Sequence, residues 1–134
     1  MHSTIIRHNF LHHINGFEGH GCVGVYLDDM FCDTLISGNL LYKVTRAAFI
    51  GGGRDCTVAN NIFVDCEPAL HIDARAIGWA NYHVDTTMKD RLFAMLFQEV
   101  RWTDFYPQLL TLWQDEPDVP KGNVVARNIS QGSR

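Results

Sequence analysis

The chain has 134 residues, of which 46% are hydrophobic and 19% are charged, and its formal net charge is −4. This size and composition suit an ordinary soluble domain with one core. The slight acidity and the lack of a basic patch argue against a nucleic-acid-binding or membrane-surface role. No apolar run approaches the roughly 18 residues of a membrane-spanning helix, and the first ten residues do not have the layout of a signal peptide. The localisation stays open.

Short β-type segments recur along the chain, each with an Asn followed by an apolar residue. The copies are STIIRHNFL (3–11), TLISGNL (34–40), CTVANNI (56–62) and NVVARNI (123–129). The two central copies are offset by 22 residues, and the first is offset from the second by 30. The 8 extra residues are expected in the Gly-rich loop at 16–21. Such a period of short β segments is typical of a solenoid in which each repeat forms one turn.

The recurrent asparagines are interpreted as structural. A coil of parallel strands must turn sharply between strands, and Asn tolerates the left-handed conformation of such a corner. Stacked Asn amides can also hydrogen-bond from one turn to the next. We therefore expect a ladder without catalytic chemistry, formed by Asn9, Asn39, Asn61 and Asn128.

A further short strand follows in three of the repeats: VGVYLDD (23–29), AAFIGGG (47–53) and ALHIDAR (69–75). Successive side chains of a strand point to opposite faces. Half of these residues should therefore point inward, namely Val25, Leu27, Ala48, Ile50, Leu70 and Ile72. The others should form outward columns: Tyr26 with Phe49 and His71, then Asp28 with Gly51 and Asp73, then Met30 with Gly53 and Arg75.

Residues 79–121 interrupt the repeats. MKDRLFAMLFQEV (88–100) has apolar residues at helical spacing, with Thr86 or Thr87 as a candidate cap, and PQLLTLW (107–113) begins a second helical run. We expect one domain: β repeats in residues 1–78, a helical insertion packed on them in 79–121, and a partial repeat in 122–134. Most aromatic residues of the insertion are expected to pack, with Trp102 and Tyr106 as candidates for stacking on a sugar.

The repeat pattern, the Asn positions and the strand order resemble the right-handed parallel β-helix of the pectin lyase-like superfamily, over residues 3–75 and 122–130. The insertion is similar to one associated with bacterial right-handed β-helix repeat proteins. The predicted fold is thus an all-β solenoid, a short right-handed parallel β-helix of about three to four turns with an α-helical insertion. The resemblance implies a polysaccharide or oligosaccharide partner bound on an outer face, and a secreted or periplasmic protein. Because enzymes of this superfamily have more turns, the chain looks like a C-terminal fragment or a small derivative.

The outward aspartates suggest inverting glycoside hydrolysis. Asp28 and Asp73 would lie two turns apart, about 9.6 Å at the usual strand spacing, and tilted carboxyls could reach the roughly 6.5–9.5 Å of inverting enzymes. One would protonate the leaving oxygen and the other would activate water, with His71 beside them. Arg75 could hold a carboxylate-bearing sugar, and Tyr26 is a further substrate-binding candidate. The alternative is that both aspartates are solvated strand ends, and a slip of one residue would substitute Asp29.

Two other functions stay open. A short groove favours a non-catalytic carbohydrate-binding or assembly module. A polysaccharide lyase would use Arg75 or a lysine as base and a carboxylate-bound calcium ion, for which the acidic residues are too sparse. Neither of the favoured functions requires a cofactor.

His12, His13, His20 and Glu18 could in principle bind a metal, but we interpret them as incidental loop residues and predict no metal site. The four cysteines lack CxxC spacing and are expected to be small packed side chains, with a disulfide as the alternative. The open end of a solenoid is an exposed strand edge, so a homo-oligomer is expected.

Overall fold

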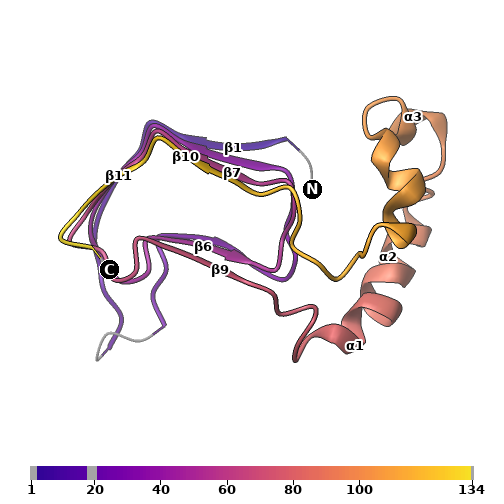
Figure 1. The fold of residues 1–134 in the computed structure, drawn as a ribbon, viewed down its shortest axis with the longest axis horizontal. Helices are drawn as coiled ribbons and strands as arrows, with labels where there is room; N and C mark the ends of the chain where they lie inside the picture. The colour runs from indigo at the N-terminus through magenta and orange to yellow at the C-terminus, as the bar shows by residue number, and fades with distance from the viewer. Residues whose placement is uncertain (1–2, 18–20, 134) are drawn as a thin grey trace. The chain divides into compact units, whose positions relative to one another are not determined.

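The computed structural model describes residues 3–17 and 21–133. The chain forms two compact units, one from Met1–Asp73 with Pro120–Arg134 and the other from Ala74–Val119. Parallel strands make up the first unit, and short helices make up the second (Figure 1). The two units are described separately below.

All strands of the first unit pair in parallel, in three sheets with the orders β1-β4-β7-β10, β11-β8-β5-β2 and β3-β6-β9. Consecutive strands enter different sheets, so the chain returns to the same sheet at every third strand. In Figure 1 the strands of one sheet lie over one another. The strands are β1 (Thr4–Arg7), β2 (Phe10–Ile14), β3 (Val25–Leu27), β4 (Thr34–Ser37), β5 (Leu40–Val44), β6 (Ala48–Gly51), β7 (Thr57–Ala59), β8 (Ile62–Val64), β9 (Leu70–Asp73), β10 (Val124–Ala126) and β11 (Ile129–Gln131).

The strand register confirms the alignment of the repeats. Ile36 pairs with Val58, Leu40 pairs with Ile62, and Phe49 pairs with His71, each at the predicted offset. The placement of the first insertion was partly wrong. The offset is 30 between β2 and β5 but 23 between β3 and β6, so seven extra residues lie between β2 and β3 and the eighth lies between β3 and β4. Residues 18–20 of that loop lie outside the described residues.

The predicted Asn ladder is confirmed. Asn39 Oδ1 accepts from both the backbone N–H and the Nδ2 of Asn9, at 3.0 Å each, and Asn61 Oδ1 accepts the same pair from Asn39. Asn128 Oδ1 in turn accepts from both nitrogens of Asn61. Asn39 and Asn61 are buried, so these bonds satisfy amides that water does not reach.

The left-handed corner lies one residue earlier than the sequence suggested. The residues with positive φ are those that precede the ladder, namely His8, Gly38, Asn60 and Arg127. The ladder asparagines are not among them, so they are required for their amides and not for an unusual backbone. Several residue types occur at this corner, because the side chains at these positions are exposed.

Aliphatic side chains from all three sheets form the core. Ile36, Leu41, Ile50 and Val58 are completely buried at its centre. The predicted inward residues of β3 and β6 are also buried, but Ile72 of β9 is 38% exposed. The reason is its position, since β9 is an edge strand and, among the described residues, no strand pairs with its outer side.

All four cysteines are free thiols, so the disulfide alternative was wrong, and the expected burial is confirmed for Cys56 and Cys66, while Cys22 and Cys32 are half-buried. Cys56 and Cys66 are buried, and their thiols donate to the carbonyl oxygens of Phe31 and Leu41. Burial raises the pKa of the Cys32 and Cys56 thiols above 9.0. These thiols are therefore poor nucleophiles near neutral pH.

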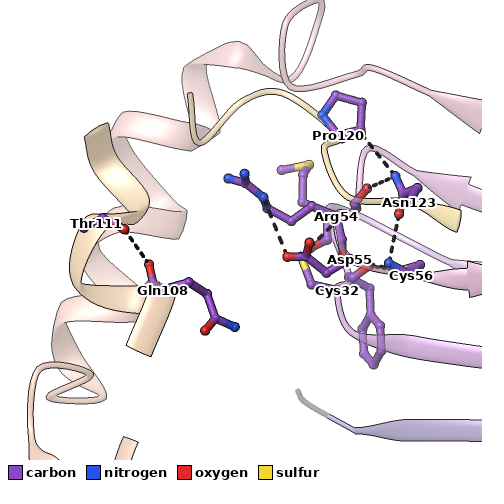
Figure 2. A network of polar contacts seen from close by, with 11 residues as sticks. Cys32, Arg54, Asp55, Cys56, Gln108, Thr111, Pro120 and Asn123 are labelled. Carbon is purple, nitrogen blue, oxygen red and sulfur yellow. Dashed lines mark hydrogen bonds and ion pairs between the residues drawn. The ribbon is translucent and has the colours of Figure 1, made fainter. Parts of the chain in front are cut away.

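Asn123 anchors the return of the chain to the first unit (Figure 2). Its Nδ2 donates to the carbonyl oxygens of Gly53 and Pro120, at 2.8 and 3.2 Å, and its Oδ1 accepts from the backbone N–H of Cys56 at 2.9 Å. The side chain thus joins the start of β10 to the preceding repeat. One asparagine here satisfies three backbone groups that no strand pairing reaches.

The second unit is helical, but its boundaries differ from those predicted. It contains α1 (Asn81–His83), the π-helix η2 (Val84–Met88), α2 (Lys89–Ala94), α3 (Val100–Thr103) and the 3-10 helix η3 (Pro107–Gln114). The helical run therefore starts before Met88 and ends at Ala94, near Leu96 with its φ of +52°. Among the described residues, no helix is long and apolar enough to cross a membrane.

The predicted cap was wrong, and the predicted apolar positions are only partly buried, with Met88 and Leu92 half-buried. Thr86 lies inside η2 and its hydroxyl donates to the Tyr82 carbonyl oxygen at 2.8 Å, so it does not cap a helix. Met95, Leu96 and Val100 are exposed. The side chains that do pack are Val84, Phe97 and Leu109, together with the edge-on pair of Phe93 and Phe97.

Candidate functional site

An aromatic column crosses the outer face of the third sheet. The rings of Tyr26 and Phe49 stack at 4.7 Å between centroids with an interplanar angle of 5°, and those of Phe49 and His71 stack at 4.5 Å and 23°. This confirms the predicted outward column. Parallel pairing places equivalent side chains one strand spacing apart, which is close to the stacking distance of aromatic rings. The column is thus a direct consequence of the repeat.

The three rings of this column differ in exposure. Phe49 lies between the other two rings and is buried, His71 is half-buried, and Tyr26 is 44% exposed. Tyr26 stands on β3, which is an edge strand of its sheet. It is therefore the ring most available to a ligand.

A pocket of about 270 Å³ opens beside Tyr26 and Phe49. Its other lining residues come from the segments just before β3, β6 and β9, and they are Gly21, Cys22, Val23, Thr45, Arg46 and Glu67. The walls thus combine aromatic rings with a hydroxyl, a guanidinium and a carboxylate. Such a mixture can contact both the apolar and the hydrogen-bonding surfaces of a small polar molecule.

Backbone geometry positions Arg46 in this pocket. Arg46 lies in the turn between β5 and β6 with a φ of +54°, and its guanidinium carbon is 4.8 Å from the Phe49 ring centroid. Its backbone N–H donates to the Glu67 carbonyl oxygen at 3.3 Å, and its own carbonyl accepts from Gly24 at 3.1 Å. The cation–π contact holds the guanidinium at the pocket wall.

Sequence reasoning identified Tyr26 but missed Arg46, Glu67, Thr45 and Cys22. The available signal was positional, because the register of the third sheet places Cys22, Thr45 and Glu67 at equivalent points before their strands. Their chemical types differ, so no repeated letter marked them. A column is visible in the sequence only when its members are alike.

Asp28 and Asp73 lie in the predicted column but not in the pocket. Asp73 pairs with Gly51, and Asp28 follows Leu27, the partner of Ile50, so one strand separates the two aspartates. Asp28 stands at a turn where its Oδ1 accepts from the Asp29 backbone N–H at 2.9 Å. This bond gives Asp28 a role in the turn itself.

Gly51, which lies between the two aspartates in the sheet, does not provide open space for a ligand. It is buried, as are the two glycines that follow it. The turn that follows Asp28 lies beside β6, where the Met30 N–H donates to the Gly51 carbonyl oxygen at 2.8 Å. Because Gly51 is buried, it offers little surface to a sugar ring.

Three other predicted binding residues belong to the second unit. Arg75 is buried, and its guanidinium carbon lies 5.6 Å from the Trp79 ring centroid. Trp102 is half-buried and its indole Nε1 donates to the Met95 carbonyl oxygen at 3.0 Å. Tyr106 is also half-buried, next to the start of η3. Their role in binding a saccharide stays a prediction.

The histidines of the first loop do not gather into a metal site within the described part of the chain. His12 and His13 lie in β2 with their Nδ1 atoms 3.1 Å apart, and His13 meets the Tyr42 ring edge-on. Glu18 and His20 lie outside the described residues. Among the residues that are described, no group of three or more His, Cys, Asp or Glu side chains could hold a metal ion.

Comparisons with known proteins do not assign the chain to a family. No protein-family model, no curated protein and no solved structure matches the chain. The resemblance to the pectin lyase-like superfamily therefore stays a prediction. The pocket and the aromatic column beside it are the features of the first unit that can bind a ligand.

Proposed function

We propose that the first unit is a short right-handed parallel β-helix and that its third sheet binds a carbohydrate without turning it over. The fold proposal is supported by three all-parallel sheets that the chain visits in rotation, and by an Asn ladder that joins one repeat to the next. Parallel strands connected in this way need no long crossover, because each strand pairs with its equivalent one turn away.

Tyr26 carries the functional proposal. Its exposed ring borders a pocket whose walls also include Thr45, Arg46 and Glu67. The C–H face of a pyranose packs against an aromatic ring, while its hydroxyls need donors and acceptors around the rim. The pocket volume of about 270 Å³ fits one sugar unit of a chain, since sites for larger ligands usually exceed about 300 Å³.

The binding of a saccharide can be tested with two matched variants. A glycan array selects a ligand, and titration calorimetry then compares the wild type with Tyr26→Ala and Tyr42→Ala. Tyr42 is an outward tyrosine of the second sheet and lines no part of the pocket. Loss of the stacking ring should weaken binding about tenfold in Tyr26→Ala only. Absence of any saccharide ligand, or equal effects of the two variants, would contradict the proposal.

Inverting glycoside hydrolysis is the second candidate, because Asp28 and Asp73 flank Gly51 in register on one face of the sheet. Two strand spacings separate their backbones by about 9.6 Å, near the range of inverting enzymes. Hydrolysis of the selected glycan that is lost in Asp73→Asn but kept in Asp65→Asn would favour it. Asp65 is an exposed residue at the end of the second sheet and serves as the control.

A further inference from the structure

The corner at the end of β2 brings two neighbouring imidazole rings together. In a regular strand, neighbouring side chains point to opposite faces. His13, however, has a φ of +51°, and this left-handed conformation breaks the alternation. As a result, the Nδ1 atoms of His12 and His13 lie 3.1 Å apart. Both side chains are exposed, so a dissolved ion can reach the pair from solvent.

The repeat accounts for this corner. Lys43 and Asp65 occupy the position of His13 in the next two repeats, with φ of +52° and +51°. Neighbouring side chains also meet at the second of these corners, where the Lys43 Nζ lies 5.1 Å from the Tyr42 ring centroid. The geometry therefore belongs to the fold, and the two histidines place metal-ligating side chains in it.

Aromatic neighbours hold both imidazole rings in place. The His12 ring packs on the Phe10 ring, with centroids 4.7 Å apart and an interplanar angle of 30°. The His13 ring meets the Tyr42 ring edge-on, at 5.2 Å and 89°. The two imidazoles are nearly perpendicular to each other, at 86°, so they meet through their nitrogen atoms and not through their faces. Rings that are already held by packing lose little freedom when they bind a ligand.

The separation of the two nitrogens suits a shared metal ion. An imidazole nitrogen binds Zn²⁺ at about 2.0–2.1 Å. Two such nitrogens are about 2.9 Å apart when they meet the ion at a right angle and about 3.3 Å apart at the tetrahedral angle. The observed 3.1 Å lies between these values. A proton gives the same contact, since one neutral imidazole can donate to the Nδ1 of the other, and a metal ion would replace that proton.

We propose that His12 and His13 form a two-pronged clamp for a divalent transition metal ion of the Zn²⁺ class, bound through both Nδ1 atoms. Among the described residues, no third His, Cys, Asp or Glu joins the pair. The ion would therefore keep positions for water or for an oxygen atom of another molecule, unlike a structural site with four protein ligands. Lys43 lies at the next corner, but its side chain is exposed, so water and salt screen its charge.

Two matched substitutions test the clamp. His13→Asn removes an imidazole but keeps a residue type that tolerates the left-handed backbone. His8→Asn makes the same change at another exposed corner, where φ is +57°. Titration calorimetry of the full chain with zinc chloride, at about pH 7.5, should give the same affinity for the wild type and for His8→Asn. His13→Asn should bind about tenfold more weakly or worse, because one ligand cannot chelate.

Nitrogen-15 NMR of the imidazoles identifies the ligand atoms. Saturating Zn²⁺ should shift the Nδ1 resonances of His12 and His13 together and leave both Nε2 atoms protonated. His12→Gln, on an exposed outward position, should weaken Zn²⁺ binding as much as His13→Asn does. Absence of Zn²⁺ binding, equal affinities of the wild type and His13→Asn, or an equal loss in His8→Asn would overturn the proposal. So would shifts confined to the Nε2 atoms.

Discussion

Replacement of Asn61 should lower the free energy of unfolding by a large amount, because its small side chain makes many buried hydrogen bonds. Its side chain makes four hydrogen bonds at 3.0 Å, donating to Asn128 Oδ1 and the Ile36 carbonyl and accepting from both nitrogens of Asn39. The site is completely buried, so water cannot replace these partners. At about 1 kcal/mol for each bond, Asn61→Ala should lower the free energy of unfolding by about 4 kcal/mol. That is a large part of the roughly 5–15 kcal/mol of a typical domain.

Asn9 provides the control, because it belongs to the same ladder but is exposed. Its side chain donates only to the Arg7 carbonyl and to Asn39 Oδ1, so Asn9→Ala should cost about 1 to 2 kcal/mol. Urea unfolding followed by circular dichroism measures both variants, at a protein concentration where the wild type is monomeric. If Asn61→Ala costs no more than Asn9→Ala, the ladder is not a source of stability and the reasoning fails.

Two further predictions concern stability. The raised pKa values of Cys32 and Cys56 mean that their contribution to stability is fully present below 9.0, the pKa of the unfolded thiols, and is lost as pH rises through the raised values. Urea unfolding measures the free energy of unfolding at about pH 8 and about pH 10. This free energy should decline less between the two pH values in the variant with both Cys32→Ala and Cys56→Ala than in the wild type, and an equal decline would contradict the prediction. Gly53→Ala should destabilise strongly, because its Cβ would collide with the Phe31 carbonyl oxygen, whereas Gly78→Ala should be nearly neutral, with its closest contact at 3.7 Å. Melting temperatures that fall equally in both variants would refute the steric argument.

The repeat architecture was predictable because each turn has the same physical needs. Every repeat must supply an inward apolar residue at the position of Ile36 and Val58, and an amide at the position of Asn39 and Asn61. These needs recur at a fixed spacing, so they leave matching letters in the sequence. The aromatic column with Tyr26 followed from the same register.

The pocket and the insertion were not predictable by this reasoning. Arg46 and Glu67 meet because successive repeats pair in parallel, yet the repeats share no residue type at these positions. In the insertion the helical period suggested one helix, but the left-handed backbone at Leu96 ends the run before the period does. Such effects depend on loops whose course no periodicity records.

The register between repeats is tested most directly by a methyl-edited NOESY spectrum of the folded protein, which records contacts from methyl groups to other methyl groups and to aromatic ring protons. Leu40 and Ile62 pair on the outer face of the second sheet, so their side chains lie about 5 Å apart and should give a strong cross-peak. Phe63, one residue further along, points into the core and should give Leu40 no comparable peak. A strong peak between the Leu40 methyl groups and the Phe63 ring, without a Leu40–Ile62 peak, would contradict the register of the repeats, and with it the proposed binding face.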